Sequence, residues 1–143
     1  MVDELPRPVP IDATRPFWDG LAVEEVRLPR CRACAAWVFY PRPRCSTCLS
    51  ADLEWQTVSG QGTIYSYTVA RQATHPAFAA QVPQLLAIVE LDEGVRITTT
   101  LVGVEPDDIR IGLPVRPVFD HGSDGITLLR FRPAAERPPP QPT

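Results

Sequence analysis

Short runs of β-branched and aromatic residues, separated by turn residues, dominate the chain from residue 53 to residue 133. This pattern predicts strands and no long helix. Five strands at this spacing favour a small closed barrel such as an OB-fold, because closure removes the bare edges of an open sheet. The predicted strands are 62–70, 84–91, 95–102, 114–119 and 125–131.

The connections between these runs carry turn signals of their own. Residues 92–94 form a short hairpin loop in which Gly94 is available for a positive φ. Pro117 inside the fourth run predicts an edge or bulged strand, because proline cannot donate to a strand ladder. Residues 104–112 predict one short helical turn, with Pro106 near its start.

A brief amphipathic helix is predicted within the N-terminal segment 14–26. Thr14 is a suitable N-cap, and Pro16 suits a first helical turn. The apolar residues of this segment share one short face: Phe17, Trp18 and Leu21. Such a face usually covers apolar surface of its own domain. The alternative is that Phe17 and Trp18 are presented to a partner, because exposed aromatic residues need a reason.

Both ends of the chain are rich in proline. Residues 1–13 are predicted to be a flexible N-terminal extension, and residues 134–143 a Pro-rich disordered tail. A docking peptide is one role for such a tail, and a solvated terminus is the more common one.

Length and charge narrow the class of protein. The chain has 143 residues and a formal net charge of -3, which suits one domain without a strong attraction to nucleic acid or anionic lipid. No apolar run is long enough to span a membrane, and the acidic N-terminus does not resemble a secretory signal, so we expect a cytoplasmic protein. All 14 basic residues other than histidine are arginine, which excludes chemistry that depends on lysine.

The most specific motif is a pair of CxxC sequences. Cys31-Arg-Ala-Cys34 and Cys45-Ser-Thr-Cys48 are separated by ten residues, which is the spacing of a zinc ribbon over 27–52. Disulfides and redox chemistry are the rivals, and both fit a cytoplasmic chain with two such pairs less well. A rubredoxin-like iron site would use the same ligands. A closed set of four thiolates leaves no position for water, so the metal is expected to be structural.

Two features of the ribbon need explanation. A glycine often follows the second cysteine of a knuckle, where the turn requires a positive φ, yet Ala35 and Leu49 occupy these positions here. We therefore expect backbone strain at both.

In addition, no acidic residue occurs between Val26 and Ala51, whereas five arginines do: Arg27, Arg30, Arg32, Arg42 and Arg44. These arginines either offset the charge of a metal–thiolate centre or bind a phosphate or carboxylate.

Candidate catalytic residues are few. His121 lies in a turn and is expected to be solvated, whereas His75 lies in a long loop together with Arg71 and Phe78. No carboxylate or hydroxyl is placed beside His75 by the sequence, so no nucleophile–base pair can be drawn and no catalytic residue is assigned.

Several segments, in this order, resemble one family. They are Pro16-Phe-Trp-Asp-Gly-Leu21, Arg30-Cys-Arg-Ala-Cys34, Phe39-Tyr-Pro-Arg-Pro-Arg-Cys45, the run 53–69, Val89-Glu-Leu-Asp-Glu-Gly94 and Pro106-Asp-Asp-Ile-Arg-Ile-Gly-Leu-Pro-Val115. Over residues 14–133 the chain is similar to the rubredoxin-like zinc-ribbon plus OB-fold proteins associated with thiolase-like acyl-CoA enzymes. The resemblance implies a mainly β protein with a short N-terminal helix, a zinc ribbon and a five-stranded OB-fold.

The resemblance also implies a role. Members of this family accompany thiolases, hydroxymethylglutaryl-CoA synthases, acyltransferases and the lipid-transfer-type aldolases of sterol side-chain breakdown. The cysteines that match the family's metal ligands are Cys31, Cys34, Cys45 and Cys48. Some members are fused to hot-dog-fold hydratases, and we expect any such hydratase to be a separate subunit here. Contact with acyl-CoA would involve the residues Arg27, Arg30, Arg42 or Arg44, with Trp37 stacking on adenine.

The leading hypothesis is therefore a non-catalytic accessory subunit of a thiolase-fold enzyme, with Phe17, Trp18 and exposed barrel surface as its interface. One alternative is a nucleic-acid-binding module, since OB-folds and zinc ribbons are common there, although the acidic balance weakens it. Another is a stand-alone enzyme that uses His75. The accessory-subunit hypothesis and the nucleic-acid-binding hypothesis both depend on analogy of fold.

Overall fold

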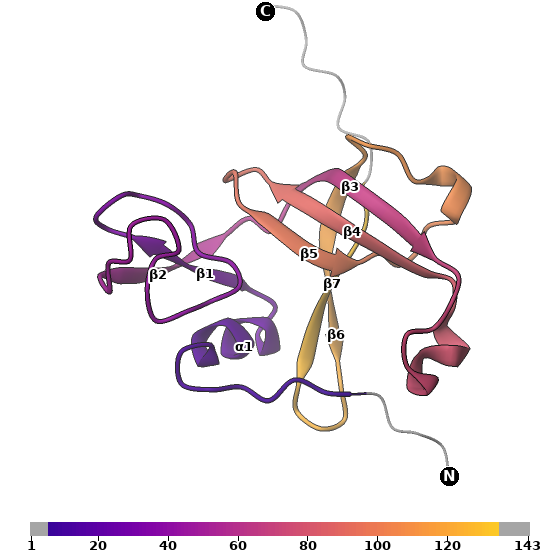
Figure 1. The fold of residues 1–143 in the computed structure, drawn as a ribbon, viewed down its shortest axis with the longest axis horizontal. Coiled ribbons are helices and arrows are strands. Elements are labelled where there is room, and N and C mark those ends of the chain that lie inside the picture. Colours follow the sequence, from indigo (N-terminus) through magenta and orange to yellow (C-terminus); the bar gives the residue numbers. More distant parts are fainter. Residues whose placement is uncertain (1–5, 135–143) are drawn as a thin grey trace, which may run out of the picture.

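The computed structural model describes residues 6–134, whose arrangement is shown in Figure 1. The elements in chain order are α1 (Arg15–Ala22), β1 (Val26–Cys31), β2 (Leu53–Val58), β3 (Gly62–Ala70), the 3-10 helix η1 (Pro76–Gln81), β4 (Gln84–Leu91), β5 (Arg96–Thr100), the 3-10 helix η2 (Pro106–Asp108), β6 (Pro114–His121) and β7 (Thr127–Pro133). The N-terminal helix, the five barrel strands and the turn within 104–112 are confirmed. Helix η1 lies in the long loop and was not predicted. No helix in this part of the chain is long and apolar enough to cross a membrane.

Strands β3 to β7 form one sheet in the order β5-β4-β3-β6-β7. A bulge between Ile64 and Ser66 interrupts the ladder of β3 with β4, and such a bulge bends a strand. The two outer strands of the sheet then meet, since Leu101 bridges Phe131 in parallel and the Val102 N–H donates to the Phe131 carbonyl at 2.8 Å. This contact closes the sheet, as expected for an OB-fold barrel.

Pro117 is accommodated where β6 has lost one of its neighbours. Strand β6 pairs with β3 only through Pro114 and Val115, whereas its pairing with β7 continues to His121. Pro117 lies beyond the last residue paired with β3, so its missing N–H breaks no bond on that side. The proline therefore marks a locally free edge, as its position in the sequence predicts.

One hydrophobic core joins the helix, the ribbon sheet and the barrel. The alternating burial along β4 directs every second residue into the barrel. Leu21 of α1 and Leu28 of β1 are fully buried in the same cluster as Phe131 of β7. Gly62 is required at the point where β3 and β4 approach, because a Cβ there would meet the Glu90 carbonyl.

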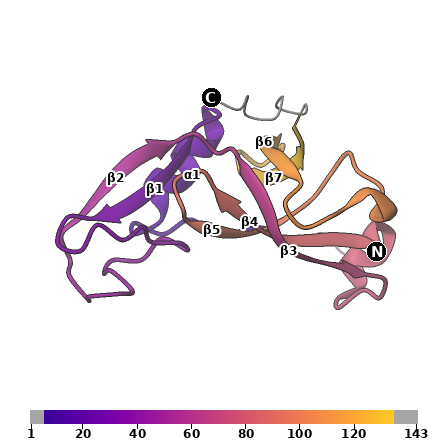
Figure 2. The same cartoon turned by 90° about the horizontal axis from the view of Figure 1, so that it is seen from above.

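Strands β1 and β2 form a separate two-stranded sheet that lies to one side of the barrel with α1 (Figures 1 and 2). They pair along their whole length, from Val26–Val58 to Cys31–Leu53. The predicted boundary between residues 52 and 53 falls inside this arrangement, so the sheet of the ribbon extends to Val58.

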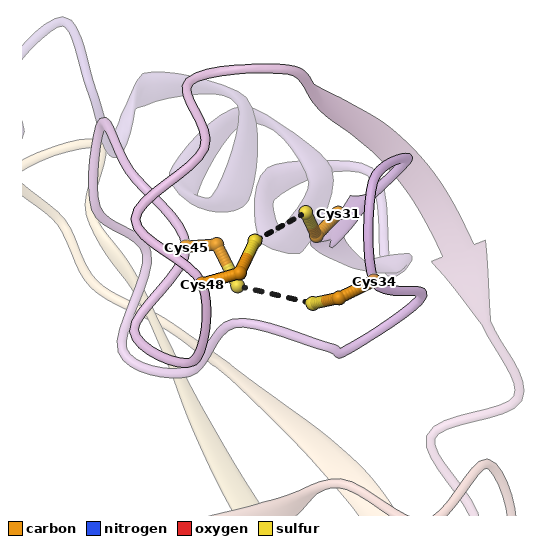
Figure 3. Close-up of side chains that lie close together, drawn as sticks. All are labelled: Cys31, Cys34, Cys45 and Cys48. Carbon is orange, nitrogen blue, oxygen red and sulfur yellow. Dashed lines mark hydrogen bonds between the residues drawn. The ribbon is translucent and has the colours of Figure 1, made fainter.

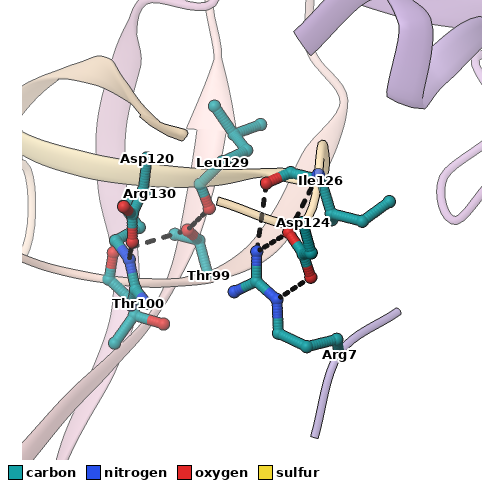
Figure 4. A network of polar contacts seen from close by, with 8 residues as sticks. All are labelled: Arg7, Thr99, Thr100, Asp120, Asp124, Ile126, Leu129 and Arg130. Atoms are coloured by element: carbon teal, nitrogen blue, oxygen red, sulfur yellow. Dashed lines mark hydrogen bonds and ion pairs between the residues drawn. The ribbon is translucent and has the colours of Figure 1, made fainter. Parts of the chain in front are cut away.

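One residue of the predicted N-terminal extension, Arg7, contacts the rest of the protein. Arg7 makes two hydrogen bonds to the Asp124 carboxylate, at 2.8 and 3.1 Å, and a third to the Ile126 carbonyl at 3.0 Å (Figure 4). The hydrogen bond from Arg7 lowers the pKa of Asp124 to about 2, with help from the Ile126 N–H. Arg7 is thus tied to the β6–β7 hairpin. Residues 1–5, and residues 135–143 of the predicted tail, lie outside the described residues.

Two further contacts stabilise the same hairpin, one within it and one to β5 (Figure 4). Arg130 forms an ion pair with Asp120 at 2.8 Å, across β6 and β7. The Thr99 hydroxyl donates to the Leu129 carbonyl at 3.1 Å and so reinforces the junction between β5 and β7.

Candidate metal centre and neighbouring surfaces

The four cysteines converge at the end of the ribbon (Figure 3). Cys31 is the last residue of β1, Cys34 lies in the turn that follows, and Cys45 and Cys48 lie in a second turn before β2. The sulfur atoms of Cys31 and Cys48 are 3.5 Å apart, those of Cys34 and Cys45 are 3.6 Å apart, and all four lie within 4.8 Å of one another. A tetrahedral zinc site with Zn–S bonds of about 2.3 Å needs sulfurs about 3.8 Å apart. The cluster fits a structural metal in a zinc-ribbon domain.

Backbone amides prepare two of these thiols to bind a metal as thiolates. The N–H groups of Cys48 and Thr47 donate to the Cys45 sulfur and lower its pKa to about 6. The N–H of Cys34 likewise lowers the pKa of Cys31. Both of these cysteines are buried, whereas Cys34 and Cys48 are exposed. The metal would therefore sit between a buried and an exposed pair of ligands.

Both CxxC turns have the same backbone geometry. In the first, the Ala35 N–H donates to the Cys31 carbonyl at 2.8 Å; in the second, the Leu49 N–H donates to the Cys45 carbonyl at 3.0 Å. Ala35 has a φ of 64° and Leu49 a φ of 67°. The left-handed conformation expected at these two positions is confirmed, and it is adopted by residues for which it is unfavourable.

The arginines of the ribbon are mostly engaged within the protein. Arg27 pairs with Glu25 at 2.8 Å, and Arg32 lies 3.4 Å from Glu54. Arg30 donates to the Ala35 carbonyl and lies over the Trp37 ring, 4.9 Å from its centre. Arg44 donates to the Leu49 carbonyl. Arg30 and Arg44 thus each support a strained turn.

Arg42 is the exception in this cluster. It is exposed and makes no hydrogen bond or ion pair with any residue of the described chain. Together with Pro43, Arg44 and Leu49, it lines a shallow hollow of about 340 Å³ beside Cys45. Of the predicted CoA-binding residues, Arg42 and Arg44 line this hollow. Trp37, one face of which is covered by Arg30, lines another hollow of about 650 Å³.

The two aromatic residues proposed for a partner interface lie in different environments. Phe17 is 4% exposed and belongs to the core, which is the more common of the two roles considered for it. Trp18 is half-buried, and its Nε1–H donates to the Tyr40 hydroxyl at 3.2 Å. The helix therefore covers the core through Phe17 and presents Trp18.

Both histidines make contacts within the fold. The Nδ1 atom of His75 accepts a hydrogen bond from the Ala77 N–H and so caps helix η1, and its ring lies against Phe78. His121 is exposed, as expected, and its ring nitrogens lie 2.9 Å from the Thr127 hydroxyl and 3.3 Å from the Glu24 carboxylate. Both contacts link elements of the fold.

Sequence reasoning missed one surface feature. Aromatic residues of α1 and of the ribbon, together with β5 and β7, line a pocket of about 250 Å³. Tyr40 is 41% exposed at this pocket. The run from Trp37 to Tyr40 showed that aromatic residues were concentrated here, but only the fold brings them to β5 and β7.

Comparison with known proteins agrees with this architecture. Residues 18–54 match the family described as the ChsH2 rubredoxin-like zinc ribbon domain, and residues 55–120 match the ChsH2 C-terminal OB-fold domain. A solved structure described as the Ltp2-ChsH2(DUF35) aldolase contains a chain with 37% identity and a TM-score of 0.77; the match covers 90% of the present chain and 100% of that one.

Three relatives extend the comparison. A DUF35 domain-containing scaffold protein of Methanocaldococcus jannaschii is 36% identical over 72% of this chain and 76% of its own length. A probable enoyl-CoA hydratase alpha subunit of Thermomonospora curvata is 41% identical over 90% of this chain. The 3-oxo-4,17-pregnadiene-20-carboxyl-CoA hydratase alpha subunit of Mycobacterium tuberculosis is 34% identical over 82% of it. The chain spans only 40% and 37% of the lengths of these two hydratase subunits.

Strain at the two turns leads to a stability prediction. Replacing Ala35 or Leu49 with glycine is expected to raise the free energy of unfolding of the metal-loaded protein by about 0.5–1 kcal/mol, because relief of the left-handed strain exceeds the added chain entropy. Chemical denaturation measures the change. Ala33→Gly is the matched control, since Ala33 lies in the same turn without a positive φ; equal effects at Ala33 and Ala35 would contradict the explanation.

Proposed function

Because the chain belongs to the ChsH2 (DUF35) family of zinc-ribbon plus OB-fold domains, we propose that it is a non-catalytic accessory subunit of a thiolase-fold acyl-CoA enzyme. An aldolase of the Ltp2 type, acting in steroid side-chain breakdown, is the proposed partner. The observation that carries the proposal is the match to the whole ChsH2(DUF35) chain of the Ltp2-ChsH2 aldolase.

The chemistry of the described residues supports a binding role. A four-thiolate site offers a metal no open position for substrate. His75 caps a helix, and His121 links Glu24 to Thr127. Contact with other molecules falls instead to aromatic surface: Trp18 and Tyr40 beside the ribbon, and Tyr65 and Tyr67, which are 47% and 39% exposed on β3.

We propose zinc as the metal of the cysteine cluster. Its ligand set and its tight sulfur spacing suit a tetrahedral ion without redox chemistry. The small second core of the ribbon contains only Cys31, Val38 and Cys45 as buried residues, so metal–sulfur bonds would supply much of the stability of this part of the chain.

The metal assignment leads to a direct prediction. The purified chain is expected to contain stoichiometric zinc by elemental analysis and to be colourless, whereas iron would give visible absorption. Cys45→Ser is expected to lose the metal, because a buried thiolate ligand is removed. Ser46→Ala, at the neighbouring exposed position, is expected to retain it. Stoichiometric iron in place of zinc would overturn the assignment.

The proposed partner is tested by co-purification. The tagged chain, co-expressed with an Ltp2-type aldolase from the same genome, is expected to form a stable complex. Trp18→Ala is expected to weaken the complex by about tenfold or more, because buried tryptophans dominate interface energies. Binding is measured by calorimetry, with zinc content as the test of an intact fold.

Val23→Ala serves as the control for this variant, since Val23 is a 60% exposed apolar residue at the C-terminal end of the same helix. Unchanged affinity of Trp18→Ala would reject this interface alone. Failure of the unmodified chain to bind any thiolase-fold enzyme, or capture of a hot-dog-fold hydratase in its place, would contradict the proposed partner.

We further propose that Arg42 and Arg44 contact a phosphate of the acyl-CoA in the complex. The double change to alanine is expected to raise the KM for acyl-CoA by about tenfold, because charge-assisted bonds to phosphate are lost. Steady-state kinetics of the assembled enzyme measure this effect. Arg110→Ala, at an exposed arginine of the barrel, is expected to leave KM unchanged. An unchanged KM in the Arg42/Arg44 variant would refute the contact.

A further inference from the structure

The pocket beside α1 has an aromatic floor and a polar rim. Phe17, Trp18, Phe39 and Tyr40 contribute four rings to it, and residues 97–100 of β5 and 128–130 of β7 form the opposite wall. The Phe17 ring meets Trp18 edge-on at 5.1 Å and Tyr40 at 6.0 Å. The hydrogen bond from Trp18 to Tyr40 fixes these two rings side by side. The surface is therefore preformed.

Such a surface suits a polyproline helix. Proline-rich segments dock on preformed aromatic grooves, and their backbone carbonyls are free because the polyproline helix has no internal hydrogen bonds. The Tyr40 hydroxyl accepts the Trp18 proton, while its own proton meets no acceptor among residues 6–134. The exposed Thr98 hydroxyl, on the opposite wall, is likewise without a described partner. Both hydroxyls can donate hydrogen bonds to the free backbone carbonyls of a proline-rich segment.

The chain itself carries a matching segment. Residues 138–142 read Pro-Pro-Pro-Gln-Pro, directly after Arg137. We propose that this segment docks, as a polyproline helix, into the aromatic pocket of the same molecule.

The distances allow the C-terminal segment to reach the pocket. Strand β7 contributes Arg130 to the pocket and leads to Ala134, whose N–H donates to the Pro114 carbonyl. Four strand residues span about 13 Å. A polyproline segment advances about 3.1 Å per residue, so six to eight residues after Ala134 reach about 19–25 Å. The proline run can therefore fold back to the pocket.

Charge and concentration favour the same occupant. Asp19 follows Trp18, is exposed and makes no ion pair in the described part of the chain, so it is available to Arg137. A short tether gives an effective concentration in the millimolar range, at which even a weak polyproline contact is largely occupied. A docked tail would also cover Trp18, and so would compete with any partner that binds there.

The test uses the full chain and the indole N–H signals of its three tryptophans in ¹⁵N NMR spectra. Changing Pro138, Pro139 and Pro140 to alanine is expected to shift the Trp18 signal and to leave Trp37 and Trp55 in place. Changing Pro8 and Pro10 to alanine, in the N-terminal segment, is the matched control and is expected to move none of the three. Zinc content verifies the fold of each variant.

A synthetic peptide of residues 135–143, added to the triple variant, is expected to restore the Trp18 signal; the same peptide with alanine at 138–140 is not. A Trp18 signal that is unaffected by the triple change would overturn the proposal. A shift that depends on protein concentration would also overturn it, since docking would then occur between copies. None of these readouts involves an acyl-CoA enzyme, so they are independent of the proposed function.

Discussion

The fold of the ribbon depends on four cysteine thiols that must come together at one point. Its separate core has only Cys31, Val38 and Cys45 as buried residues, whereas Leu28 and Trp37 pack on the main core. The end of the ribbon that carries the cysteines therefore has little apolar area of its own to order it. Convergence of the sulfurs within 4.8 Å requires two tight turns, and these turns force Ala35 and Leu49 into left-handed conformations. The metal–sulfur bonds must then outweigh both the strain and the weak core.

The same constraint explains the distribution of charge around the cluster. A zinc ion with four thiolates carries a net negative charge, and the ribbon has no acidic residue between Val26 and Ala51 to add to it. Arg30 and Arg44 bond to the carbonyls of the two strained residues, so they support the turns as well as offset the charge. Arg27 and Arg32 pair with acids that lie outside the ribbon loop. Of the five ribbon arginines, Arg42 alone makes no hydrogen bond or ion pair within the described residues.

Local patterns predicted what depends on local chemistry. The cysteine cluster expected from the CxxC spacing, the strand at 84–91 and the positive φ at Ala35 each depend on residues close together in the chain, and each was predicted correctly. The contact of Arg7 with Asp124 joins residues 117 positions apart, so no spacing rule could have shown it. Burial of Phe17 was undecided for a similar reason. An aromatic residue on a short helix is either core or surface, and only packing against the barrel decides which.

The aromatic pocket shows why the candidate binding surface was the least predictable part. Its residues come from four segments that are separated in the sequence: α1, the ribbon loop, β5 and β7. Leu21 and Leu28 bury the helix and the ribbon sheet in the core of the barrel, and this packing sets Trp18 and Tyr40 against β5. The rings of this pocket lie beside the Tyr40 and Thr98 hydroxyls, so the surface combines apolar area with groups that can donate hydrogen bonds. A surface assembled from four elements depends on the packing of helix, ribbon and barrel together, so no single segment of the sequence could have indicated it.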